Sequence, residues 1–419
     1  MRHPLEALAR AVVRRDGLTV SRPVGAKPGG ATFPLAVVRT RPRRSAPPGR
    51  LPVLAIPGGP GMASVVPYAG LRRLAAAEGL DLVMVEHRGV GLSRRDQLGA
   101  DLPVASVTAE AAADDLAAAL DAARVERAVV YGSSYGSFLA QVLTARHPGR
   151  VAALVLDSPL LSPREDLAAV RAHRRRLLWD GEDPALAPVA AAVREAARAG
   201  VPMAELTAVV QEVHDRAGPA VLLSLLRSRR EGRRLRTWRW VARLGTGDPE
   251  TGDRRCVVER DLVAGIAHGQ IGFGLPPDGG PLDPQLLTAG DRSALTSRPT
   301  ATAEPFDAPA RLAELAGSGT PLVVVSADRD LCTPPPVAER AAGLVPGSAL
   351  VRLGSTGHSA LDGHQLAAVR IAAAVADGAA HHLPGLADHL TALPRRGHGH
   401  LRGLALREVV GVDSASARS

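Results

Sequence analysis

Residues 127–137, RAVVYGSSYGS, carry a short β-branched run that ends abruptly in GSSYG at 132–136, and a helical pattern follows at once. A Gly-x-Ser-x-Gly sequence between a strand and a helix is typical of a nucleophile elbow. In such an elbow the serine lies on a sharp, strained turn, where any side chain at Gly132 or Gly136 would crowd the backbone. The pattern predicts that Ser134 is a nucleophile, and the competing interpretation is a plain loop rich in glycine and serine.

The bulk composition is that of a large globular protein. At 419 residues the chain can bury a large core, in one domain or two, and 46% hydrophobic with 22% charged residues is ordinary for such proteins. The formal net charge is +9, which would suit an anionic partner. However, Lys27 is the only lysine, and the richness in Ala, Gly and Pro indicates a codon bias towards G and C. We therefore expect a solvated surface rich in arginine.

Cysteine usage and the N-terminus indicate the compartment. Cys256 and Cys332 lie far apart and form no C-x-x-C, so we expect neither a disulfide framework nor a zinc cluster. Residues 1–17 alternate apolar and charged residues and lack the apolar region of a secretory signal. No apolar run approaches the length that spans a bilayer. The sequence predicts a cytoplasmic protein with no membrane partner.

Strand patterns alternate with helical patterns on both sides of the elbow. The strands expected before and after it span residues 33–40, 51–56, 81–86, 127–132, 151–156, 322–326 and 349–353. Helices are expected at 108–123, 134–147 and 335–344. This alternation is typical of an α/β fold, with a mainly parallel, doubly wound sheet covered by helices.

The alternation is interrupted between about residues 160 and 300. Helical patterns dominate there, with arginine runs at 171–176 and 227–236 and tryptophans at 238 and 240. Arginine runs beside tryptophans would suit a nucleic-acid face, but solvated helices explain them equally well, and we expect no nucleic-acid partner. The predicted organisation is an α/β core formed by residues 1–159 and 301–378, a mostly helical cap at 160–300, and a C-terminal tail at 379–419. Five histidines of the tail fit no tight metal site, and we expect no metal and no cofactor.

Chemically useful residues follow four of the predicted strands. A Gly-Gly loop lies at 57–61, Ser134 at the elbow, an aspartate at 328 or 330, and His358 after the last strand. Ligands of open α/β sheets bind at the carboxyl ends of the strands, so these side chains are expected to meet. His358 would take the proton of Ser134, and the aspartate would fix the imidazole tautomer. Position alone does not decide between Asp328 and Asp330.

The backbone would stabilise the charge that develops in such a reaction. The N–H groups of Gly59 and Tyr135 are expected to bind the oxyanion of the tetrahedral intermediate, with Gly58 as the alternative to Gly59. The chain order Ser…Asp…His is that of α/β-hydrolases.

Several of these stretches resemble the proline iminopeptidase and tripeptidyl-aminopeptidase group of α/β-hydrolases. PGGPG at 57–61 matches the Gly-Gly-Pro-Gly oxyanion loop of that group, and EHRGVGLS at 86–93 resembles its D-x-R-G-x-G-x-S segment, with Glu86 in place of Asp. YGSSYGS at 131–137, continuing to Asp157, is similar to the tripeptidyl branch. DLCTP, which begins at Asp330, resembles the D-x-x-T-P that carries the family acid, and Gly357-His358 matches the family's G-H. The resemblance thus favours Asp330 over Asp328.

The resemblance implies a serine aminopeptidase that releases N-terminal residues, with proline as one candidate, from short peptides. Three features depart from it: Pro57 replaces the usual His of iminopeptidases, Tyr135 replaces their Trp, and the secretion signal common in the tripeptidyl branch is absent. Cap carboxylates of this group bind the substrate's free amine, and four candidates remain open here: Glu205, Glu212, Glu231 and Glu259.

Two other functions compete with the aminopeptidase. An esterase, lactonase or thioesterase acting on small acyl substrates would use the same machinery, since one fold hosts many chemistries. A binding protein without catalysis is the third interpretation, and the intact Ser134, Asp330 and His358 argue against it. A small peptide or acyl compound is the expected partner in the first two cases.

Overall fold

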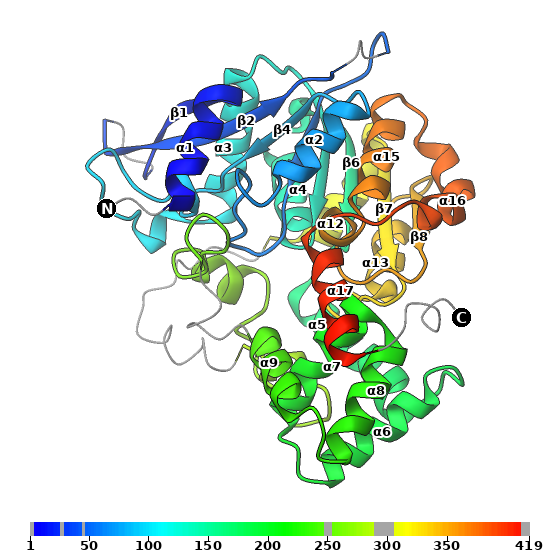
Figure 1. The fold of residues 1–419 in the computed structure, drawn as a ribbon. Helices are drawn as coiled ribbons and strands as arrows, with labels where there is room; N and C mark the ends of the chain where they lie inside the picture. Colours follow the sequence, from blue (N-terminus) through cyan, green and yellow to red (C-terminus); the bar gives the residue numbers. More distant parts are fainter. Residues whose placement is uncertain (1–3, 26–28, 44–46, 247–253, 289–305, 412–419) are drawn as a thin grey trace.

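The structure is a computed structural model, and it describes residues 4–25, 29–43, 47–246, 254–288 and 306–411 (Figure 1). Its centre is an 8-stranded sheet in the order β1-β2-β4-β3-β5-β6-β7-β8. The strands are β1 (Gly17–Pro23), β2 (Thr32–Thr40), β3 (Val53–Ile56), β4 (Leu82–Val85), β5 (Ala128–Ser133), β6 (Val151–Asp157), β7 (Leu322–Ala327) and β8 (Ala349–Leu353).

Most strand pairs of the sheet are parallel. Only β2 runs antiparallel to its neighbours β1 and β4, and the pairs from β4 to β8 are all parallel. The predicted mainly parallel sheet is therefore confirmed. Every strand expected from its apolar run is present, whereas β1 was not predicted, because its residues are half-buried and alternate with exposed ones.

Helices cover both faces of the sheet (Figure 1). In β3, Leu54 and Ile56 pack into a core with α3, α4 and α13, while Val53 and Ala55 point to the opposite core with α2 and α15. This alternation follows from the period of two along a strand, and burial on both faces explains the unbroken apolar runs. The helices outside the cap are α1 (Pro4–Asp16), α2 (Ala69–Ala77), α3 (Ala109–Ala122), α4 (Tyr135–Arg146), α12 (Ala308–Ser318), α13 (Pro335–Gly343), α14 (Ala360–Gly363), α15 (Gln365–Ala376), α16 (Ala387–Ala392) and α17 (His398–Val410).

The segment between β6 and α12 forms a second, helical layer, drawn in green in Figure 1. Its helices are α5 (Pro163–Arg175), α6 (Ala187–Arg198), α7 (Met203–Ala217), α8 (Pro219–Arg230) and α9 (Leu235–Thr246). They enclose an apolar core of their own, which includes Leu178, Val213, Leu222 and Trp238. Residues 254–288 return towards the sheet with short helical turns only.

The C-terminal segment contributes a helix between the two layers. Helix α17 contacts α7 and α8 of the cap and also α14, which follows β8 (Figure 1). Leu406 and Val410 are fully buried in the cap's core. Gly403 allows the close approach, because a side chain there would lie 2.2 Å from the carbonyl oxygen of Arg216. The helix at the end of the predicted C-terminal tail, residues 379–419, thus packs between cap and core.

Among the described helices, none combines the length and the apolarity that crossing a membrane would require.

Candidate active site

The serine elbow is formed where β5 meets α4. Ser134 lies between them with φ 54° and ψ −123°, a backbone conformation that non-glycine residues rarely adopt. A side chain at Gly136 would lie 2.1 Å from the carbonyl oxygen of Ile56, at the end of β3. The two glycines of the motif are therefore required by the packing of the turn, as the sequence predicts.

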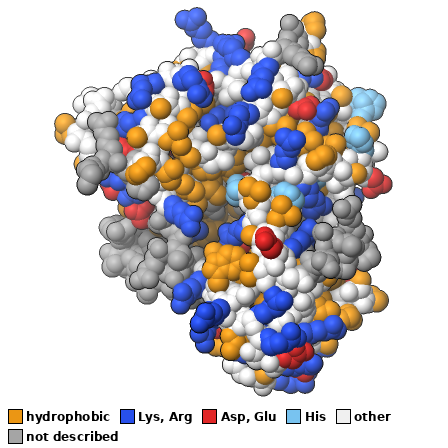
Figure 2. All heavy atoms as spheres, in the orientation of Figure 1, with side chains coloured by type: hydrophobic (Ala, Val, Ile, Leu, Met, Phe, Trp, Pro, Cys, Tyr) orange, Lys and Arg blue, Asp and Glu red, His pale blue; other side chains and the backbone are white. Residues whose placement is uncertain are grey.

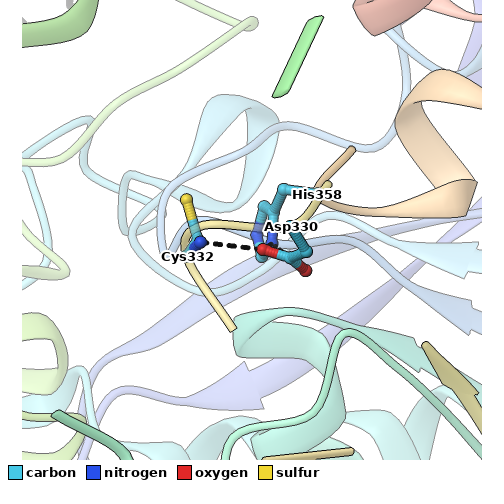
Figure 3. A group of neighbouring side chains, drawn as sticks. All are labelled: Asp330, Cys332 and His358. Atoms are coloured by element: carbon cyan, nitrogen blue, oxygen red, sulfur yellow. Dashed lines mark hydrogen bonds and ion pairs between the residues drawn. The ribbon is translucent and has the colours of Figure 1, made fainter. Parts of the chain in front are cut away.

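The structure brings Ser134, His358 and Asp330 together. His358 Nε2 lies 2.9 Å from Ser134 Oγ, and His358 Nδ1 lies 2.9 Å from Asp330 Oδ2 and 3.0 Å from Oδ1. Figure 3 shows the Asp330 and His358 side chains next to each other, although Asp330 follows β7 and His358 follows β8. An ionised carboxylate can only accept hydrogen bonds, so Nδ1 donates and Nε2 is free to accept the proton of Ser134.

The surroundings of His358 and Asp330 shift the pKa values of both side chains. Burial alone would lower the pKa of His358, but the charge of Asp330 and the hydrogen bond to it outweigh burial, and the pKa is raised. Burial would raise the pKa of Asp330, and the interaction with His358 and the N–H of Thr333 lower it instead. Asp330 thus remains ionised at neutral pH, which fixes the imidazole in the tautomer that can accept a proton at Nε2.

The two candidate aspartates have different environments. Asp330 is fully buried, and its Oδ1 accepts hydrogen bonds of 2.8 Å from the N–H groups of Cys332 and Thr333. Asp328 is exposed and accepts the N–H groups of Ser355 and Thr356 at 2.7 and 3.0 Å. Asp328 therefore shapes the loop after β8, and Asp330 is the one that contacts His358.

A buried carboxylate that the sequence analysis did not consider anchors the histidine loop. Asp157, at the end of β6, accepts the N–H groups of Ala360 and Leu361 at 3.1 and 3.0 Å. Its carbonyl oxygen accepts the N–H of Ser134 at 2.8 Å. Burial raises the pKa of Asp157 to about 6 even though backbone donors lower it. Its place directly after a buried strand was the sequence signal for such a role.

The loop after β3 lies against the elbow. A side chain at Gly58 would lie 3.1 Å from Ser134 Cβ and 3.6 Å from its Oγ, whereas a side chain at Gly59 would meet only its own loop. Both glycines line the cavity above Ser134. The Tyr135 side chain is buried away from the cavity, with its hydroxyl 2.8 Å from Nε2 of the half-buried His87.

Ser134 and His358 open into a cavity of about 690 Å³ between the sheet and the cap. Figure 2 shows hydrophobic side chains gathered in the hollow between these two layers. Helices α5 and α7 and residues 258–288 form its roof. Most of the lining is apolar, and the charged side chains that reach it are Asp166, Arg174, Arg216, Arg260, Asp261 and Asp362.

The four glutamates that remained open as candidate amine ligands lie elsewhere. Glu205 accepts the indole N–H of Trp238, Glu212 forms an ion pair of 2.5 Å with Arg402, Glu231 lies at the surface, and Glu259 accepts the N–H of Gly91. None of them is part of the cavity lining in the described residues. Helix registers and loop paths decide which acidic side chains face the cavity, and the sequence pattern does not contain that information.

Asp166 is a cavity carboxylate, and one of its oxygens accepts no hydrogen bond from the described residues. Its Oδ2 accepts the N–H groups of Leu161 and Ser162 at 2.7 and 3.0 Å. Its Oδ1 is buried without a hydrogen bond in the part of the chain that the structure describes, and Arg340 Nη1 lies 3.7 Å from it. Asp166 is only 6% exposed, and burial raises its pKa to about 6.

Asp330, Cys332 and His358 also form a group of potential metal ligands, with donor atoms within 4.8 Å of one another. The Asp330 oxygens already accept hydrogen bonds from the backbone of Cys332, drawn dashed in Figure 3, and from His358. Burial raises the pKa of the Cys332 thiol, and metal ligation requires the thiolate. The donor set thus fits a hydrogen-bonded acid–histidine pair better than a metal site.

Among the comparisons with known proteins, the family model supports the fold. A family model described as alpha/beta hydrolase fold matches residues 52–188. One similar solved structure is a proline iminopeptidase from Mycobacterium smegmatis, with 18% sequence identity, coverage of 86% of this chain and 97% of that chain, and a TM-score of 0.45. A thermophilic esterase from Thermogutta terrifontis has 19% identity, covers 86% of this chain and 97% of its own, and has a TM-score of 0.44. A third is Est816, an N-acyl homoserine lactone degrading enzyme, with 18% identity, coverage of 79% of this chain and 92% of that chain, and a TM-score of 0.40. No sequence of a curated protein matches the chain. At such low identity the structures indicate no particular substrate.

Proposed function

The chain has the α/β-hydrolase fold, and from this premise we propose that it is a serine hydrolase that forms an acyl-enzyme on Ser134. The observation that carries the proposal is the continuous contact from Ser134 Oγ through His358 to Asp330, at the bottom of a cavity large enough for a small substrate. This geometry satisfies the requirement that a general base lie within hydrogen-bond reach of the nucleophile.

In the proposed reaction, Ser134 Oγ attacks the carbonyl carbon of the substrate while His358 Nε2 takes the serine proton. The N–H of Tyr135 and that of Gly58 or Gly59 bind the oxyanion of the tetrahedral intermediate. His358 then gives the proton to the leaving group, and the carbon–nitrogen or carbon–oxygen bond breaks. Water, activated by the same imidazole, hydrolyses the acyl-enzyme and restores Ser134.

Among the acyl substrates, we favour peptides with a free N-terminal amine. Asp166 supports this choice, because the residue lines the cavity of the nucleophile and its Oδ1 has no hydrogen-bond donor among the described residues. An ammonium group that leaves water needs a carboxylate partner, and a buried carboxylate equally needs a cation. The apolar majority of the lining is the observation that favours the second candidate, an esterase for small acyl compounds.

A kinetic comparison distinguishes the two candidates. An aminoacyl 4-nitroanilide with a free amine should be hydrolysed faster than its N-acetylated counterpart. Asp166→Asn should raise KM for the free-amine substrate by about tenfold, the effect of losing one charge-assisted contact, and change hydrolysis of a 4-nitrophenyl ester little. Glu231→Gln is the matched control, since Glu231 lies at the surface. If N-acetylation does not slow hydrolysis, the aminopeptidase proposal is wrong and the esterase is retained.

A further inference from the structure

A second, smaller pocket adjoins the active site on the side of His358. It has a volume of about 30 Å³ and lies between the end of α7, α17 and the loop that carries His358. Arg216 and His358 line both this pocket and the large cavity, so the two spaces are neighbours. A volume of this size holds about two water molecules or one carboxylate group.

The Arg216 guanidinium is available to a ligand. Its side chain makes no hydrogen bond or ion pair with any residue that the structure describes. Three carboxylates lie near enough to raise its pKa, namely Glu212, Asp362 and Asp215. Each already has another partner: Glu212 pairs with Arg402, Asp362 accepts the hydroxyl of Tyr68, and Asp215 accepts the N–H of Leu331.

Other cations surround the same pocket. Arg395, Arg407 and His400 line it together with Thr356 and one carboxylate, Asp215, which accepts the N–H of Leu331. Burial lowers the pKa of Arg395, and the charges of Arg329 and Arg407 lower it further. Cations that repel one another in a partly buried pocket are stabilised when an anion binds between them.

Helix α17 fixes the position of Arg216. A side chain at Gly399 would lie 2.4 Å from Arg216 Nη1, so the glycine leaves the space that the guanidinium occupies. Gly403, one turn later, packs on the backbone of the same residue. The C-terminal helix therefore forms one wall of the pocket.

The position of the smaller pocket relative to His358 indicates which part of a substrate enters it. In the proposed reaction His358 gives its proton to the leaving group, so the leaving group must lie beside the imidazole. The cationic pocket lies beside that imidazole as well.

From this geometry, and resting on the proposed function, we propose that Arg216 and its neighbours form an anion subsite for the leaving group of the substrate. The ligand is the free carboxylate of a leaving amino acid. The preferred substrates are then very short peptides, in which the residue after the cleaved bond ends the chain, and the products are free amino acids.

The first experiment measures kcat/KM for prolyl-leucine and for prolyl-leucinamide, which differ only in the carboxylate. The wild-type protein should prefer the carboxylate by about 10- to 100-fold, the range expected for a charge-assisted contact. Arg216→Gln should reduce this preference to about twofold or less, and Arg216→Lys should retain part of it. Arg352→Gln is the matched control, because Arg352 is exposed and pairs with Glu339 at the surface. A preference that is absent in the wild type, or unchanged in Arg216→Gln, overturns the proposal.

The second experiment measures binding alone and does not depend on catalysis. Leucine, leucinamide and inorganic phosphate are titrated into the wild-type protein and into Arg216→Gln by calorimetry. Leucine should bind the wild type about tenfold more tightly than leucinamide, and the difference should vanish in the variant. Equal binding of leucine and leucinamide, or tighter binding of phosphate than of leucine, contradicts a carboxylate subsite. If leucine binds as expected but no peptide is hydrolysed, the subsite is retained and the proposed function is wrong.

Discussion

The exchange Asp330→Asn tests how the acid acts on His358, and the hydrogen bonds around it determine the result. Asp330 Oδ1 accepts the N–H groups of Cys332 and Thr333, each at 2.8 Å. An asparagine must keep its oxygen at that position, because an NH₂ group there would face two donors. Its NH₂ group then takes the place of Oδ2, which lies 2.9 Å from His358 Nδ1.

This orientation reverses the tautomer of the histidine. Nδ1 would accept a hydrogen bond from the new amide, the ring proton would move to Nε2, and Nε2 could no longer accept the proton of Ser134. A wrong tautomer in a serine–histidine–aspartate triad costs up to about 10⁴-fold in kcat, which corresponds to about 5.5 kcal/mol at about 1.4 kcal/mol per factor of ten. We expect a loss of this order, with KM little changed.

The assay is steady-state hydrolysis of an aminoacyl 4-nitroanilide or a 4-nitrophenyl ester, whichever the wild type cleaves. Asp328→Asn is the matched control, since Asp328 accepts only backbone N–H groups of the loop after β8, and its activity should fall less than about tenfold. A loss below about tenfold in Asp330→Asn, or equal losses in both variants, would refute the tautomer argument.

Two further predictions concern buried titratable groups. His358 must be neutral to accept a proton, and its pKa is raised above the usual 6.5. The value of kcat/KM should therefore rise with pH through a midpoint above 6.5. A midpoint below pH 6 would contradict this prediction. Burial raises the pKa of Glu86 from 4.5 to about 7, so its contribution to stability is complete below pH 4.5 and is lost as the pH rises through 7. Denaturant unfolding should therefore show that Glu86→Gln is more stable relative to wild type at pH 8 than at pH 5, by about 3 kcal/mol at most; a pH-independent difference would exclude the effect.

The central strands and the contact of Ser134 with His358 could be predicted because local sequence determines the elements that carry them. Buried parallel strands require unbroken apolar runs, and the elbow requires glycines at 132 and 136, so both leave a pattern in the sequence. The position of His358 after a strand was equally informative. The preference for Asp330 over Asp328 required the resemblance to a known group. In the structure, Asp330 Oδ2 lies 2.9 Å from His358 Nδ1.

The cavity lining could not be predicted, because it depends on how the cap lies over the sheet. Four glutamates were equally plausible amine ligands in the sequence, yet the carboxylates that line the cavity are aspartates, among them Asp166 near the start of α5. The role of the C-terminal helix was equally hidden, since Gly399 and Gly403 leave no apolar pattern and act through their lack of a side chain. Arg216 belongs to a chain rich in arginine, and what distinguishes it is its place beside His358 without an ion pair to any described residue.

The most direct test of the proposed chemistry identifies the residue that becomes acylated. A fluorophosphonate probe is added to the wild type and to Ser134→Ala, and the labelled peptide is sequenced by mass spectrometry. We predict a single adduct on Ser134, absent from the variant, because Ser134 Oγ lies 2.9 Å from His358 Nε2. Ser133 is fully buried and bonded to Ser359, so it should remain unlabelled. Labelling of Ser133, or equal labelling of Ser134→Ala, would contradict the assignment of the nucleophile.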